Sequence, residues 1–306
     1  MQLDAIVVGG SFAGLSAAMQ LARARRRVLV IDAGRPRNRF ATSSHGFFGQ
    51  DGRSPEEIKE TARTQLAAYP TVEFVDGEAS RAEREKDGLA VTLASGKTRL
   101  ASRLILAFGI VDDLPEVKGV RERWGRTVLH CPYCHGYEVA GQRFGVLATS
   151  EMSIHQALML LHWGSDITVF TNDTLMLTDD QRAALRAGGI RIEERPIETL
   201  LGEAPALDGV KLRDGHRIAL DALFTGSRTR MASPLAEQLG CAFDDGPFGP
   251  IIRTDAFKET TVPGVYAAGD AARAPHNATW ASADGVTAGI AAHRALVMAD
   301  VAARRS

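Results

Sequence analysis

The fold of this chain follows from its first apolar stretch and the turn after it, Asp4-Ala5-Ile6-Val7-Val8-Gly9-Gly10-Ser11-Phe12-Ala13-Gly14. The apolar run is long enough for a short buried strand, and it breaks at a glycine turn. A helical pattern follows over residues 15–24, and a second apolar run over residues 27–31 ends at Asp32. Strand, glycine turn, helix, strand and acid in this order predict a dinucleotide-binding βαβ unit.

The glycine turn carries the binding chemistry of that unit. Backbone N–H groups at a helix N-terminus bind a pyrophosphate, and the acid accepts hydrogen bonds from ribose hydroxyls. Asp32 follows Gly9 by 23 residues, which suits this role, although Ser11 replaces the middle glycine of the motif and narrows the approach to phosphate. The alternative is an ordinary βαβ crossover that binds no nucleotide. The predicted cofactor residues here are Gly9, Gly10, Ser11, Phe12, Ala13, Gly14 and Asp32.

Further elements complete the first part of the chain. Ser54-Pro55-Glu56-Glu57 predicts a helix start, with a capping serine, a proline at the first helical position and acids in the first turn. Strands are expected over residues 72–79, 89–93, 97–100 and 104–109, the last ending at Gly109. Residues 114–119 resemble a linker, so a domain boundary is expected near residue 114.

A redox motif stands near the middle of the chain, in Cys131-Pro132-Tyr133-Cys134-His135-Gly136-Tyr137-Glu138. Two thiols at this spacing close a disulfide with almost no loop to order, and a following helix N-terminus activates the first thiolate. The alternative is half of a zinc site, but zinc needs four ligands and the only other cysteine, Cys241, stands alone. The motif favours dithiol/disulfide exchange, and no metal site is predicted.

A second βαβ pattern follows, with strands expected over residues 143–148 and 166–170 and a helix over residues 153–163. Its turn, Ala148-Thr149-Ser150-Glu151-Met152-Ser153, contains no glycine, and Glu151 would repel a pyrophosphate. The second strand ends in Phe170-Thr171-Asn172-Asp173 rather than in the arginines that hold a 2′-phosphate. The fold of a nicotinamide domain is therefore expected without its binding chemistry, so NADPH is not expected to bind.

The end of the chain repeats the pattern of a strand closing on a polar turn. Residues 261–270 end in Gly269-Asp270, a loop containing His276 and Asn277 follows, and a long helix is expected from Ala278 to Ala303. Asp270 can accept a hydrogen bond from a ribityl hydroxyl. The N-terminus of the last helix can offset charge at the N1–C2=O edge of a flavin.

Length and net charge indicate how many domains the chain can form and which partners it is not expected to bind. A chain of 306 residues is long enough for two domains, and a net charge of −1 gives no reason to expect nucleic acid or a membrane surface as a partner. The first apolar run enters the glycine turn without a cleavage pattern, and no uninterrupted apolar span of membrane length is expected. We therefore expect a cytoplasmic protein, and in a reducing cytosol a C-x-x-C pair is more plausibly catalytic than structural.

Taken in order, the motifs resemble those of the low-molecular-weight thioredoxin reductase family over nearly the whole chain. They are the N-terminal glycine turn, Ala107-Phe108-Gly109 where the family usually has Ala-Thr-Gly, the pair Cys131 and Cys134, and Val265 to Asp270. The resemblance implies an α/β fold with two Rossmann-like domains, an FAD-binding domain from residues 1–114 and 244–306 and an inserted disulfide domain from residues 115–243. It also implies a homodimer, and cofactor contacts at Gly109, Gly269, Asp270, Asn277 and Ala278.

The same resemblance implies that Cys134 faces the flavin and that Cys131 exchanges with substrate. The chain departs from the family at His135, which replaces an acid, and in the missing NADPH motifs. Both features are similar to the branch that oxidises dithiols of small molecules, as in epidithio and dithiolopyrrolone biosynthesis, and passes electrons to oxygen. We therefore expect an FAD-dependent thiol oxidase acting on a small-molecule or peptide dithiol.

Two other functions stay open. One is a thioredoxin-disulfide reductase, acting on a thioredoxin-like protein with NADPH or another donor. The other is a non-catalytic flavin redox sensor, against which the histidine beside the disulfide argues, because a sensor needs no general base.

Single residues near these motifs have competing roles. His135 can exchange protons with substrate thiols, because its ordinary pKa of about 6.5 suits thiol chemistry; otherwise it only begins a helix. Glu138 is expected to orient His135, whereas the role of His130 stays open. His45 and His276 lie in loops that the family fold brings towards the flavin, and the alternative for each is a surface position. Cys241 is expected to be a buried apolar residue, and Trp280 to serve packing.

Overall fold

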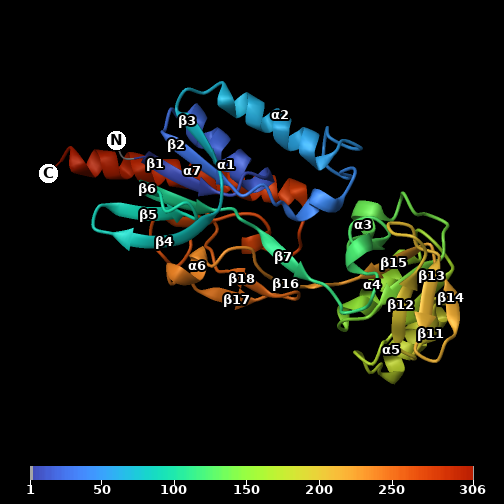
Figure 1. Ribbon diagram of the computed structural model, residues 1–306. Coiled ribbons are helices and arrows are strands. Elements are labelled where there is room, and N and C mark those ends of the chain that lie inside the picture. Colours follow the sequence, from blue (N-terminus) through green and yellow to red (C-terminus); the bar gives the residue numbers. More distant parts are fainter. Residues whose placement is uncertain (1–2, 306) are drawn as a thin grey trace. The chain divides into compact units, whose positions relative to one another are not determined.

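The computed structural model describes residues 3–305 and separates into two compact units (Figure 1). The first unit comprises Met1–Arg39, Pro55–Val111 and Thr229–Ser306, and the second comprises Phe40–Ser54 and Asp112–Arg228. The sequence places the second boundary at residues 243 and 244, whereas the chain re-enters the first unit at Thr229. The reason is packing, because Leu235 and Ala236 of the following helix are fully buried in the core of the first unit.

A largely parallel sheet forms the centre of the first unit. Its strand order is β3-β2-β1-β6-β5-β4, and β19 pairs with the second half of β6. The pairs β1–β2, β1–β6, β2–β3 and β6–β19 are parallel, whereas β4, β5 and β6 form an antiparallel meander. The strands are β1 (Leu3–Val8), β2 (Val28–Asp32), β3 (Val72–Asp76), β4 (Ala79–Glu85), β5 (Gly88–Leu93), β6 (Thr98–Leu106) and β19 (Val265–Ala267).

Different elements cover the two faces of this sheet. One face packs against α1 (Phe12–Arg23) and α7 (Ala278–Ala303), with α2 (Pro55–Ala67) beside α1. The other face packs against the β4–β5 hairpin and α6 (Leu235–Gln238). The side chains divide by alternation along β1 and β2, with Ala5, Val7, Val28 and Val30 on the helical face and Ile6, Val8, Leu29 and Ile31 on the other.

Helices α1 and α7 approach each other closely because α7 carries glycine at the contact. A Cβ atom added at Gly285 would lie 2.0 Å from the Ala13 carbonyl oxygen, and one at Gly289 would lie 2.6 Å from that of Ala17. By length and composition α7 is also apolar enough to cross a membrane. Asp284 and Arg294 interrupt its apolar sequence, so α7 is not the uninterrupted apolar span whose absence was expected.

The second unit is built on a five-stranded parallel sheet of order β11-β10-β9-β15-β8, flanked by the antiparallel sheet β12-β13-β14. Its strands are β8 (Val128–Leu129), β9 (Phe144–Leu147), β10 (Ile167–Phe170), β11 (Arg191–Glu193), β12 (Ile197–Leu201), β13 (Gly209–Leu212), β14 (Arg217–Ala219) and β15 (Ala222–Thr225). Its helices are α3 (Pro132–His135), α4 (Met152–Leu160), α5 (Asp179–Ala187) and the 3-10 turn η2 (Arg121–Arg123). Both units are thus Rossmann-like α/β structures, and the predicted fold class is confirmed.

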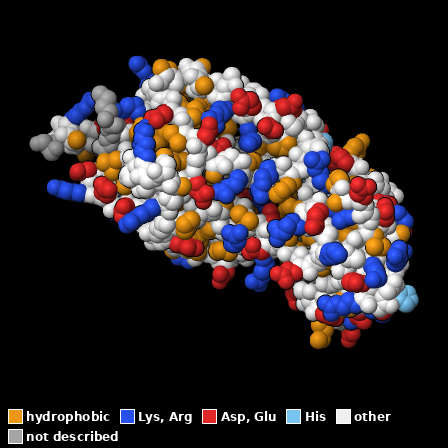
Figure 2. Space-filling model, in the orientation of Figure 1, with side chains coloured by type: hydrophobic (Ala, Val, Ile, Leu, Met, Phe, Trp, Pro, Cys, Tyr) orange, Lys and Arg blue, Asp and Glu red, His pale blue; other side chains and the backbone are white. Residues whose placement is uncertain are grey.

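The remaining elements connect and close the units. Strands β7 (Ile110–Asp113) and β16 (Arg228–Met231) pair with each other where the chain passes between units. The 3-10 turns are η1 (Arg37–Phe40) and η3 (Asp270–Ala272), and β17 (Phe243–Asp245) pairs with β18 (Pro250–Ile252). Charges of both signs are interspersed over the face of the molecule seen in Figure 2, in keeping with the net charge of −1.

Candidate active site

The redox motif lies at the junction of β8 and α3 in the second unit. Cys131 is the N-cap of α3, with an extended backbone at φ −111° and ψ 117°, and Pro132 begins the helix. One turn later the Cys134 N–H donates to the Cys131 carbonyl at 3.2 Å, and the two sulfur atoms are 2.7 Å apart. The two thiols are therefore close enough to form a disulfide when two electrons and two protons are removed, and that disulfide returns to two thiols when it is reduced. The expected helix after Cys131 is present, but it has only four residues.

Neighbouring elements fix the position of this short helix. A Cβ atom at Gly136 would lie 2.6 Å from the Pro132 carbonyl oxygen and 2.9 Å from the Trp163 ring, so the turn after α3 packs tightly. The Tyr133 ring meets Trp163 edge to face at a centroid distance of 5.5 Å. Before the motif, Gln156 of α4 donates its side-chain amide to the His130 carbonyl at 2.6 Å. Both ends of the C-x-x-C segment are thus held by packing around α4.

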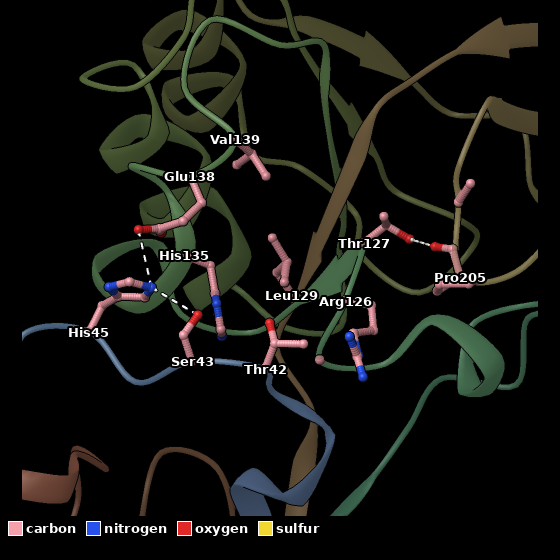
Figure 3. A pocket seen from close by; sticks show the side chains of 12 residues that line it. Thr42, Ser43, His45, Arg126, Thr127, Leu129, His135, Glu138, Val139 and Pro205 are labelled. Carbon is pink, nitrogen blue, oxygen red and sulfur yellow. Dashed lines mark hydrogen bonds and ion pairs between the residues drawn. The ribbon is translucent and has the colours of Figure 1, made fainter. Parts of the chain in front are cut away.

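His45, His135 and Glu138 line the same pocket, and His135 directly follows the cysteine pair in sequence. The segment Phe40–Ser54, which belongs to the second unit, brings His45 Nε2 to 3.4 Å from Glu138 Oε1 and 3.1 Å from Ser43 Oγ (Figure 3). His45 Nδ1 also lies 3.6 Å from Asp51 Oδ1. The acid expected to orient His135 therefore pairs with His45 instead. This pairing involves residues nearly a hundred positions apart, so no local sequence pattern could indicate it.

The electrostatics of His135 follow from this arrangement. Burial lowers the pKa of the His135 imidazole, the Glu138 carboxylate partly opposes this by raising the pKa, and the His45 imidazole lowers it further. The net shift is downward, so His135 is neutral at pH 7 and can accept a proton from a thiol. The first of the two expected roles, that of an acid–base residue, is therefore physically possible here.

A pocket of about 440 Å³ opens beside His135. Figure 3 shows His135 and Arg126 on either side of Thr42, with Leu129 and Val139 above them in this view. The lining residues are Thr42, Ser43, His45, Gly125, Arg126, Thr127, Leu129, His135, Glu138, Val139, Pro205 and Ala206, all of them in the second unit. Arg126, Thr42 and Pro205 were not expected at a site, because they belong to no motif. The volume lies within the range typical of small-molecule sites.

The N-terminal glycine turn has the close backbone packing that the binding of a pyrophosphate requires. Gly9 has φ +115°, and a Cβ atom there would lie 2.2 Å from the Ala107 carbonyl oxygen. At Gly10 a Cβ atom would lie 2.5 Å from the Asp32 carboxyl carbon, so the acid closes directly over the turn. Ser11 is the N-cap of α1 and makes no side-chain capping hydrogen bond, which leaves N–H groups of the first turn for a ligand.

Asp270 and His276 both contact Arg37, an arginine that the sequence did not indicate. Arg37 Nη1 lies 3.3 Å from Asp270 Oδ2 and 2.8 Å from His276 Nδ1, all within the first unit. Gly109 and Gly269 adopt left-handed conformations, at φ +72° and +78°, where their strands end. Asn277 caps α7 by accepting from the Thr279 N–H at 2.7 Å, so its side-chain oxygen already has a partner. His45 and His276 thus lie in different units.

The turn of the second βαβ pattern is closed by its own side chains. The Thr149 N–H donates to Ser153 Oγ at 3.1 Å, and Thr149 Oγ1 donates to the Gly226 carbonyl at 2.7 Å. Glu151, at the N-cap of α4, is exposed and makes no side-chain capping hydrogen bond. After β10, Asn172 accepts from the Ile197 N–H at 2.8 Å. The Thr149 N–H and the Asn172 side-chain oxygen are thus engaged within the protein, and the exposed Glu151 carboxylate places a negative charge at this turn.

Three further candidates from the sequence make contacts with neighbouring side chains. Cys241 is 6% exposed in the core of the first unit, and burial raises the pKa of its thiol, which confirms it as a buried small residue. Trp280 stacks under the Arg273 guanidinium at 5.4 Å. The His130 ring lies 6.4 Å from that of Trp124. Within residues 3–305, no group of three His, Cys, Asp or Glu side chains is arranged to hold a metal ion.

Comparison with known proteins establishes the family. The model of the pyridine nucleotide-disulphide oxidoreductase family matches residues 3–285, and the chain belongs to this family. It is 34% identical to thioredoxin reductase sirT of Leptosphaeria maculans, over 98% of this chain and 96% of that protein. Among solved structures, it matches an oxidoreductase from Agrobacterium tumefaciens with 48% identity and a TM-score of 0.93, over 97% of this chain and 99% of that one. The structure of HlmI matches with 38% identity and a TM-score of 0.92, over 99% of this chain and 95% of HlmI.

These matches confirm the resemblance to thioredoxin reductase-like flavoproteins. The family implies FAD as the resident cofactor, and the residues present fit it. Gly9 and Gly10 leave room only for backbone at the turn, and the Asp32 carboxylate lies against it. Asp270 begins η3, three residues after β19 of the same sheet. The close packing at the turn is the feature that only glycine allows.

Proposed function

We propose that this member of the family is an FAD-dependent thiol oxidase, which forms a disulfide in a small-molecule or peptide dithiol and passes the electrons to oxygen. One observation carries the proposal. Within one unit, the Thr149–Ser153 hydrogen bond closes the turn that would hold a nicotinamide dinucleotide, whereas the Cys131–Cys134 pair directly precedes His135, which lines a pocket of small-molecule size. Electrons then enter from a thiol substrate rather than from NADPH.

The exchange steps follow from the residues of the second unit. Neutral His135 accepts the proton of the first substrate thiol, and the resulting thiolate attacks the sulfur of Cys131 in the Cys131–Cys134 disulfide. A mixed disulfide forms and the Cys134 thiolate leaves. The second substrate thiol then attacks the substrate sulfur of the mixed disulfide, so the substrate disulfide forms and Cys131 is released. The substrate loses two electrons and two protons, and the cysteine pair gains them.

FAD, when bound, supplies the two-electron carrier between the cysteine pair and the final acceptor. Molecular oxygen takes up the two electrons and two protons and leaves as hydrogen peroxide. One substrate disulfide therefore forms for each oxygen molecule consumed.

A thioredoxin-disulfide reductase is the second candidate. It is favoured by the name of the relative sirT, a thioredoxin reductase that matches over nearly the whole chain. In that case NADPH or another donor reduces the cysteine pair, and a thioredoxin-like protein takes the electrons. The two candidates differ in the direction of electron flow, and a non-catalytic sensor differs from both because it would not turn over.

The decisive experiment uses the yellow holoenzyme under anaerobic conditions. A dedicated NADPH site makes several charge-assisted contacts to the pyrophosphate and the 2′-phosphate, each worth roughly 1.5–3 kcal/mol. Without these contacts, NADPH binding should be weaker by at least a few powers of ten. We therefore expect NADPH to leave the flavin oxidised over seconds, whereas an excess of dithiol bleaches it. Air should then restore the colour with formation of hydrogen peroxide. Rapid bleaching by micromolar NADPH in a stopped-flow trace would establish the reductase instead.

The partners and location form part of the proposal. We infer a cytoplasmic homodimer that acts on a dithiol and binds neither nucleic acid nor a membrane. The near-neutral net charge supports the absence of nucleic acid. Although α7 has the composition of a membrane span, its Ala281, Gly285, Ala288 and Ala292 are buried on the side that packs with α1, as in a core helix.

A further inference from the structure

Arg126 is the one arginine that lines the pocket beside His135, although a second arginine, Arg123, lies three residues before it. Arg123 is 4% exposed and donates to the carbonyls of Ala206, Gly119 and Gly202, so it serves the fold. Arg126, three residues later, is exposed and lines the pocket. Across residues 3–305, no side chain forms an ion pair or hydrogen bond with the Arg126 guanidinium. The Arg126 guanidinium is therefore available to pair with an anionic group of a ligand.

The other polar groups of the pocket are mostly engaged. The Thr127 hydroxyl donates to the Pro205 carbonyl at 2.6 Å, and Ser43 Oγ lies at hydrogen-bond distance from His45. The Glu138 carboxylate, the acid of the lining, is paired with His45. Arg126, Thr42 and His135 therefore set the recognition chemistry, and they surround an apolar wall formed by Leu129, Val139, Pro205 and Ala206.

We propose that this pocket binds a small dithiol that carries a carboxylate, with Arg126 as the residue that pairs with the carboxylate. This rests on the proposed thiol oxidase function and names its class of substrate. The carboxylate matches the planar fork of a guanidinium, the hydrocarbon part of the ligand contacts Leu129 and Val139, and the thiols lie at the His135 end, on the side of the cysteine pair whose Cys131 they attack. A phosphate-bearing or nucleotide ligand fits less well, because the lining offers one arginine and no aromatic ring for stacking other than imidazoles.

A matched pair of probes isolates the carboxylate. Dihydrolipoate and dihydrolipoamide share the same dithiol and hydrocarbon chain and differ only in carboxylate against carboxamide. We expect the holoenzyme to oxidise dihydrolipoate with a kcat/KM about fivefold above that of dihydrolipoamide, the upper range for a solvent-exposed ion pair. In Arg126→Gln this ratio should fall to near one, and Arg126→Lys should keep part of it. Arg121→Gln, an exposed arginine outside the lining, should leave the ratio unchanged.

A binding measurement separates failure of this inference from failure of the proposed function. Calorimetric titration with oxidised lipoate needs no turnover, and Arg126→Gln should weaken its binding about fivefold relative to that of lipoamide. Equal ratios in wild type and Arg126→Gln, in oxidation and in titration, would overturn the carboxylate pocket while leaving the oxidase intact. Arg126-dependent lipoate binding without any oxygen-dependent dithiol oxidation would retain the pocket and overturn the oxidase.

Discussion

The pKa of His135 is lowered by burial and by His45 and raised by Glu138, with a net downward shift. The neutral form of His135 accepts a thiol proton, so dithiol oxidation should fall as the pH drops below the His135 pKa. Because burial lowers that pKa, the acid limb of the pH profile should have its midpoint below the ordinary value of about 6.5. His135→Asn should remove this limb and reduce kcat/KM at neutral pH roughly a hundredfold. Steady-state oxygen consumption across pH measures both effects.

Neighbouring substitutions sharpen this test. Glu138 raises the pKa of His135 and His45 lowers it, so Glu138→Gln should move the limb to lower pH and His45→Asn to higher pH. His155→Asn, on the exposed side of α4, serves as the control and should leave the profile in place. An unchanged acid limb in His135→Asn would show that another group takes the thiol proton.

The two cysteines should give distinct products when each is replaced. Cys131→Ser should keep FAD and lose disulfide exchange. In Cys134→Ser the Cys131 thiolate should attack an added linear disulfide, release one of its thiol halves and keep the other as a mixed disulfide, because the resolving thiol Cys134 is absent. Mass spectrometry of the intact protein after disulfide treatment measures the adduct. Cys241→Ser is the control, since its buried thiol has a raised pKa and should not react. Substrate trapped on Cys134 in place of Cys131 would reverse the assigned roles.

At the scale of elements, strong local signals determined which parts of the fold could be predicted. The glycine turn, the start of α2 at Pro55 and the end of the chain in α7 each follow from capping, proline or apolar pattern, and all three are confirmed. The expected strands 97–100 and 104–109 are one strand, β6. Polar Ser102 and Arg103 lie between the two expected strands, and β6 accommodates them because β5 pairs with its first half and β19 with its second.

Other elements lacked such a signal. Strand β4, Ala-Ser-Arg-Ala-Glu-Arg-Glu, is largely charged, and only Ala79 and Ala82 of it are buried, so it has almost no apolar pattern. The segment Phe40–Ser54 is polar and rich in turns, yet it supplies Thr42, Ser43 and His45 to the pocket. The cysteines and His135 were found because their chemistry lies in consecutive residues. Arg37 and Arg126 were missed because their roles depend on residues distant in sequence.

At the scale of the whole molecule, the chain passes between the two units four times rather than twice. A single insertion, as the sequence predicts, accounts for Asp112–Arg228. The earlier excursion, Phe40–Ser54, is too short to have a core of its own and becomes recognisable only from its contacts in the second unit. The pocket of the second unit is therefore assembled from two segments separated by a strand-rich part of the first unit.

The homodimer implied by the family resemblance leads to the last prediction. Ile290, Val297 and Val301 of α7 are 45%, 38% and 40% exposed, and their spacing of seven and four residues places them on one side of the helix, away from its contact with α1. An exposed apolar row of this kind favours burial against a partner, and the partner we expect is a second copy. Light scattering after gel filtration should give about twice the chain mass of 32.8 kDa.

The double variant Ile290→Asp, Val297→Asp should elute as a monomer that retains FAD, because aspartates in an apolar interface stay unpaired. Met176→Asp, a charge placed on a methionine that is 90% exposed in the second unit, should leave the dimer intact. A wild-type monomer, or a dimer that survives the double substitution, would place the interface elsewhere or exclude it.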